Sequence, residues 1–97
     1  MGGRRRRRYA GAMVIEVLGL ADEQTAALHA ALEEALATPG LAGVAEVRLI
    51  SDPAALVARS VWRSPGLRID GRVVCRGRVP AVAEIRDLVE RARAAST

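Results

Sequence analysis

Four kinds of side chain in this sequence are candidates for chemistry: a lone thiol, a carboxylate before a predicted helix, one imidazole and a run of arginines. The first three are Cys75, Asp22 and His29. Asp22 and His29 are residue types of general acids and bases. However, seven positions along a helix separate them by about 10 Å. We therefore interpret Asp22 as a helix cap and His29 as a surface or half-buried helix residue.

Cys75 is the only cysteine, which excludes an intramolecular disulfide and any Cys-x-x-Cys centre for redox chemistry or zinc. It lies on a predicted strand, where a small buried hydrophobe is the plain interpretation. The alternative is a reactive single thiol that forms a mixed disulfide with glutathione or a partner. Its ionisation would then be favoured by Arg68 and by Arg76 or Arg78. The residues predict no metal and no cofactor.

The net charge of +4 is concentrated at the start of the chain. Residues 13–97 hold ten arginines and all eleven acidic residues, a balance of −1. The remaining five basic residues form a run without aromatic stacking partners: Arg4, Arg5, Arg6, Arg7 and Arg8. We expect residues 1–12 to be a disordered tail, native or a leader, and residues 13–97 to be one domain. Binding to nucleic acid or another polyanion is expected only through this tail.

The predicted compartment is the cytoplasm. A chain without disulfides suits a reducing environment. The arginine run before an apolar stretch superficially resembles a signal peptide, but Glu16 interrupts the stretch, and the same residues are needed as a core strand. No run approaches the roughly 18 to 20 apolar residues of a membrane span, so we expect no membrane partner.

The first half of the domain reads as strand, helix, strand and short helix. Residues 13–18 are apolar except for Glu16, as in an inner parallel strand. Asp22 caps a helix that stops at residues 38–40, Thr-Pro-Gly. Residues 44–50 alternate apolar and charged side chains, which predicts a half-exposed strand. Asp52 and Pro53 open a short helix that ends near Ser60.

The second half reads as a hairpin and a last helix. Asp70 and Gly71 lie between two β-prone runs, and Asp-Gly is the residue pair that a type I′ turn prefers. That turn would place Leu67 opposite Val74 and Gly66 opposite Cys75. The last helix opens at Val79-Pro80 and carries an apolar stripe. The predicted order is β-α-β-α-β-β-α.

These residues resemble the small thioredoxin-like proteins of bacteria and archaea known as redox-active disulfide proteins. The resemblance is continuous over residues 52–85 and looser over residues 13–28. Residues 64–74 read S-P-G-L-R-I-D-G-R-V-V, where the family reads close to T-P-A-L-V-I-D-G-K-V-V. Residues 77–80 read G-R-V-P and residues 84–85 read E-I, against G-K-V-P and E-I in the family.

The resemblance implies an α/β, minimal thioredoxin-like fold with a four-stranded mixed sheet in order 2-1-3-4. The first and last helices would cover one face and the middle helix the other. It also implies a cis Ser64-Pro65 bond beside the active-site loop. The two thiol positions of the family fall on Asp22 and Thr25.

This departure from the family directs the functional hypothesis. Asp22 places a permanent anion where a helix N-terminus would stabilise a thiolate, and Thr25 offers no resolving thiol. Ordinary thiol–disulfide exchange at this site is therefore excluded. The resemblance leaves a redox-inactive binding or adaptor module that docks a protein or peptide along a groove beside the cis-proline. The expected partner-binding residues are Leu20, Ala21, Trp62, Ser64, Pro65 and Gly77.

Two points stay open at this stage. Trp62 is either a binding anchor or a core filler, because it is the only tryptophan in a small domain. A homodimer is also expected, through sheet surface that the short middle helix leaves uncovered. The alternatives to an adaptor are a single-cysteine thiol protein that uses Cys75 and an accessory protein held to polyanions by the arginine tail.

Overall fold

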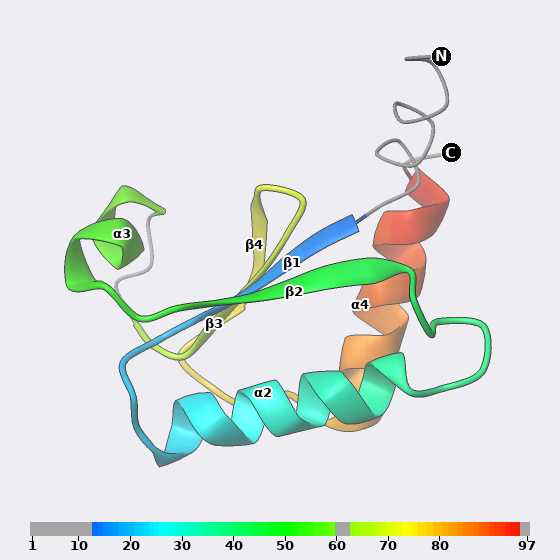
Figure 1. Ribbon diagram of the computed structural model, residues 1–97, viewed down its shortest axis with the longest axis horizontal. Helices are drawn as coiled ribbons and strands as arrows, with labels where there is room; N and C mark the ends of the chain where they lie inside the picture. Colours follow the sequence, from blue (N-terminus) through cyan, green and yellow to red (C-terminus); the bar gives the residue numbers. More distant parts are fainter. Residues whose placement is uncertain (1–12, 60–62, 96–97) are drawn as a thin grey trace.

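The computed structural model describes residues 13–59 and 63–95 (Figure 1). Its elements are β1 (Met13–Leu18), α2 (Glu23–Leu36), β2 (Ala45–Ile50), α3 (Pro53–Ala58), β3 (Gly66–Ile69), β4 (Arg72–Arg76) and α4 (Val82–Ala95). The strands form one sheet in the order β2-β1-β3-β4. β1 and β2 are parallel, and the other two pairs are antiparallel. The predicted element order and sheet order are confirmed.

The first two helices begin at their predicted caps. Asp22 accepts a hydrogen bond from the Thr25 amide, and Asp52 accepts one from the Ala55 amide. The last helix begins at Val82, later than predicted, and the Ala81 carbonyl accepts its first bond. The predicted start was wrong at Val79, because the residue before a proline disfavours the helical region. Ser60, the predicted end of the middle helix, lies outside the described residues.

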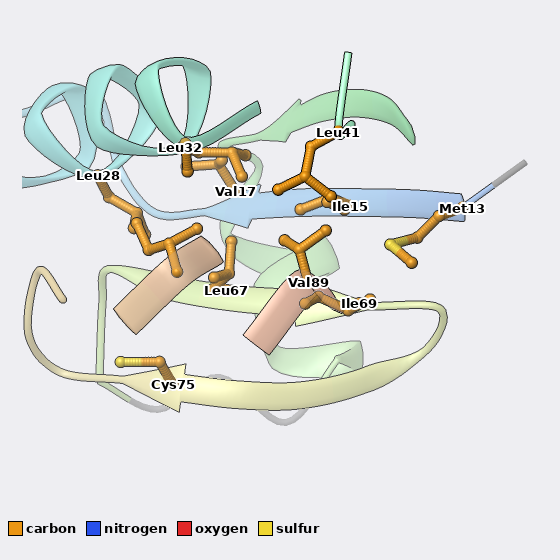
Figure 2. Close-up of a cluster of buried hydrophobic side chains, with 12 residues drawn as sticks. Met13, Ile15, Val17, Leu28, Leu32, Leu41, Leu67, Ile69, Cys75 and Val89 are labelled. Atoms are coloured by element: carbon orange, nitrogen blue, oxygen red, sulfur yellow. The ribbon is translucent and has the colours of Figure 1, made fainter. Parts of the chain in front are cut away.

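The main core lies between the sheet and the helices α2 and α4. Alternate residues of β1, namely Met13, Ile15 and Val17, face this layer, as the period of a strand requires. Leu28 and Leu32 of α2 meet them with no exposed surface (Figure 2). The cluster also contains Ala35, Leu41, Leu67, Ile69, Cys75, Ile85 and Val89.

The opposite face of the sheet carries α3 and a smaller cluster. Leu18 of β1 packs with Leu56 of α3 there. Glu16 points to the same face and is 5% exposed. Its Oε1 accepts hydrogen bonds from Arg68 Nη1 at 2.7 Å and Arg59 Nε at 3.2 Å. We call Glu16, Arg59 and Arg68 the charged triad.

The predicted hairpin turn is present, but the predicted register was wrong. Asp70 and Gly71 have φ values of 49° and 85°, as the predicted turn requires. Leu67 pairs with Cys75, not Val74, and Gly66 pairs with Arg76, not Cys75. A β-bulge between Leu67 and Arg68 shifts the register by one residue. As a result, Cys75 shares the main-core face with Leu67 instead of facing α3.

No helix within residues 13–59 and 63–95 is long and apolar enough to cross a membrane.

Candidate functional site

Strand pairing brings the predicted site segments to one end of the sheet. Leu18, the last residue of β1, pairs with Gly66, the first residue of β3. The junction between β1 and α2 (residues 19–22) therefore lies at the same end as residues 63–65, which we call the proline loop. The Ser64-Pro65 peptide bond is cis. The Gly77 amide donates to the Pro65 carbonyl at 2.8 Å, which fixes the end of β4 beside this loop.

Asp22 occupies the N-terminus of α2 as a charged cap. Its Oδ1 accepts from the Thr25 amide at 2.8 Å. This backbone bond, followed by the nearby Thr25 hydroxyl, lowers the pKa of the Asp22 carboxyl below its ordinary value. The carboxylate is exposed and stays ionised at neutral pH. An anion thus already fills the position where the field of the helix would stabilise another one.

Thr25, the second family thiol position, is turned into the protein. It is 3% exposed, and its hydroxyl makes no well-formed hydrogen bond with any described residue. The hydroxyl lies against the backbone of Gly19, where any added Cβ would collide with it. Sequence analysis missed Gly19, although a glycine between a strand and a helix cap is a signal of close approach. Thr25 therefore fills space below the junction and offers no surface to a partner.

The predicted partner-binding residues differ in their accessibility. Leu20 is 49% exposed, and Ala21 and Ser64 are also exposed. Pro65 is fully buried, whereas Gly77 is exposed with φ of 79°. Trp62 lies outside the described residues, as do the five arginines at positions 4–8.

Ser64 has backbone groups that no described residue satisfies. Residues 13–59 and 63–95 provide no hydrogen-bond partner for its N–H or its C=O. Ser64 directly precedes the cis bond and lies just outside β3.

A separate hollow of about 550 Å³ lies on the other side of the junction. No residue of the proline loop lines it, so sequence analysis did not anticipate this hollow. His29 lines this hollow, and its Nε2 lies 3.3 Å from Oε2 of Glu33, one turn further along α2 and outside the lining. The lining residues are Ala21, Asp22, Glu23, Thr25, Ala26, His29, Leu49 and Ser51.

Cys75 is buried against the main core at 7% exposure. Burial raises the pKa of its thiol, and the charge of Arg78 opposes this rise without overcoming it. Arg78 itself is bound to Glu84 through two hydrogen bonds of 3.0 and 2.6 Å. The prediction that Arg68 favours ionisation of the Cys75 thiol was wrong, because Arg68 pairs with Glu16 on the opposite face of the sheet.

The described residues hold no group of three or more His, Cys, Asp or Glu side chains that could bind a metal ion.

A family model for the thioredoxin domain matches residues 13–90. The chain belongs to the thioredoxin domain family. The curated proteins contain no match to it. Family membership agrees with the fold and with the resemblance seen in the sequence, and it makes the junction and the proline loop the region to consider for function.

Proposed function

We propose that this protein is a redox-inactive member of the thioredoxin domain family that binds an extended protein or peptide segment beside the proline loop. The observation that carries the proposal is the backbone of Ser64 next to the cis bond, whose N–H and C=O have no hydrogen-bond partner among the described residues. A partner strand would pair with this N–H and C=O, and exposed Leu20 across the loop would contact its side chains.

The loss of redox chemistry follows from the two residues at the start of α2. Thiol–disulfide exchange needs a thiolate that attacks and a second thiol that resolves the mixed disulfide. Asp22 supplies a carboxylate with a low pKa, and Thr25 supplies a buried hydroxyl. Neither group can carry electrons between sulfur atoms, whereas binding through backbone hydrogen bonds needs no sulfur.

The thiol alternative has less support. A reactive cysteine needs an accessible sulfur and a lowered pKa. Cys75 is buried and its pKa is raised, so it resembles a small core residue. The polyanion alternative depends on the arginines at positions 4–8, which lie outside the described residues.

Binding is tested with peptides selected from a random displayed library against the full chain. The full chain should enrich extended peptides, and Leu20→Glu should weaken their binding at least tenfold. Val57→Glu is the matched control, because Val57 is 51% exposed on α3 while Leu20 is 49% exposed at the junction. Failure to enrich any peptide, or equal losses in both variants, would refute the binding site.

Redox inactivity is tested by the reduction of insulin disulfides with dithiothreitol as the electron source. The natural chain should not accelerate the reaction. The double variant Asp22→Cys with Thr25→Cys should accelerate it, because two thiolates can then pass two electrons to insulin and be reduced again by dithiothreitol. Activity of the natural chain that disappears in Cys75→Ala would favour the single-thiol alternative instead.

A further inference from the structure

We propose that β2 is the contact strand of a homodimer, in which the β2 strands of two copies pair antiparallel around a two-fold axis at Val47. The contact lies across β1 from the proline loop, because β1 separates β2 from β3 in the sheet. It therefore does not rest on the proposed binding function. It also differs from the α3 face that the sequence suggested for a dimer.

β2 is an edge strand whose outer backbone is free within the described part of the chain (Figure 1). The carbonyls of Val44 and Ile50 accept from β1, which fixes the alternation of the parallel ladder. Even-numbered residues of β2 thus turn their backbone groups to β1. Ala45, Val47 and Leu49 turn theirs outward, ready for another strand.

A two-fold axis at Val47 uses these free groups in the correct register. Val47 would pair with Val47 of the second copy, and Ala45 with Leu49 of the second copy. All three have outward N–H and C=O groups, so these become the hydrogen-bonded pairs of an antiparallel ladder. If the register shifted by one residue, backbone groups that point outward in one copy would face groups that point toward β1 in the other. The hydrogen bonds between the two β2 strands would then be lost.

In this register, each charged side chain of β2 faces the opposite charge on the second copy. Glu46 would face Arg48 of the second copy, and Arg48 would face Glu46. These are the pairs without backbone hydrogen bonds, where side chains lie closest. Within one copy, Glu46 Oε2 already accepts from Arg48 Nε at 2.8 Å on exposed side chains. The two Glu46–Arg48 pairs, one from each copy, would form a four-charge network across the axis.

The apolar face of β2 has a matching shape. Leu49 is 54% exposed, the most exposed large apolar side chain of the described residues. In the proposed register it would lie beside Ala45 of the second copy, at a hollow of about 270 Å³. This hollow lies between β2 and the end of α2, and its apolar lining is Leu36, Ala37, Leu41, Ala42, Ala45 and Val47. The two-fold axis forms this contact twice, because Leu49 of each copy lies beside Ala45 of the other, as in any interface between identical surfaces.

Analytical ultracentrifugation of the full chain over micromolar to millimolar concentrations tests the dimer. The natural chain should show a reversible dimer. Arg48→Glu and Glu46→Arg should each raise the dissociation constant at least tenfold, because like charges then face each other across the axis. Arg91→Glu is the control: it makes the same change of charge in an exposed α4 ion pair with Asp87 and should leave the constant unchanged.

Mixing the two single variants tests the proposed register of the β2 strands. Equimolar Arg48→Glu and Glu46→Arg chains should form a heterodimer, because every facing pair is then opposite in charge. The double variant Glu46→Arg with Arg48→Glu should recover the homodimer. A natural chain that stays monomeric at all concentrations, single variants that dimerise like it, or a mixture that stays monomeric would each overturn the proposal.

Discussion

The two faces of the sheet are closed by different kinds of interaction. On the α2 and α4 face, side chains such as Ile15, Leu28 and Ile85 have no exposed surface. On the α3 face, the apolar cluster contains two buried residues among those that the structure describes, Leu18 and Leu56. The charged triad supplements this cluster. Apolar burial on the first face is insensitive to pH, whereas the second face depends on the ionisation of one carboxylate.

This difference has a structural cause. α2 and α4 each contain 14 residues and lay apolar side chains along the sheet, whereas α3 contains 6. A short helix covers only the end of the sheet near Leu18. Glu16, at an earlier position of β1, is bound by the guanidinium groups of two arginines instead. The α3 face should therefore tolerate truncation better than the main core.

The largest expected effect is in the main core. Leu28→Ala removes a side chain with no exposed surface and should lower the free energy of unfolding by about 2 to 5 kcal/mol. Leu56→Ala, in the small α3 cluster, should cost less because the site borders solvent. Leu28→Met keeps the volume and should cost less than about 1.5 kcal/mol. Urea denaturation measures all three, and equal losses for Leu28→Ala and Leu56→Ala would contradict the comparison.

Those features of the fold that depend on local chemistry could be predicted from the sequence. The caps at Asp22 and Asp52 and the turn at Asp70 and Gly71 each follow from residues a few positions apart. The β-bulge could not be predicted, because it arises from packing. It lets the consecutive residues Val74 and Cys75 both contact the main core.

The site was less predictable than the fold. The positions of Asp22 and Pro65 followed from the family resemblance, but the inward side chain of Thr25 depends on space that Gly19 leaves free. The ion pair between Arg68 and Glu16 links residues 52 positions apart. This ion pair forms only if β1 and β3 are neighbours in the sheet, and no local sequence pattern indicates that.

An intermediate effect is expected in the charged triad. Glu16→Gln removes the charge that neutralises Arg59 and Arg68 while keeping the shape of the side chain. It should lower the free energy of unfolding by about 1.5 to 3 kcal/mol at neutral pH, the range for hydrogen bonds to charged groups. Glu84→Gln, in the exposed pair with Arg78, is the control and should change stability much less. A loss in Glu84→Gln as large as in Glu16→Gln would show that burial of the triad does not matter.

The last effect is the loss of this difference between the natural chain and Glu16→Gln as the pH falls. Burial raises the pKa of Glu16, but hydrogen bonds from Arg68 and Arg59 and their charges outweigh it, so the folded pKa lies below 4.5. A lowered folded pKa means that the unfolded chain binds the proton more readily, so the stabilisation is complete above pH 4.5 and is lost as pH falls through the folded value. Below that value, protonated Glu16 resembles glutamine. The stabilities of the natural chain and Glu16→Gln should therefore converge in acid, as measured by urea denaturation at a series of pH values, and a constant difference would show that the carboxylate charge does not stabilise the α3 face.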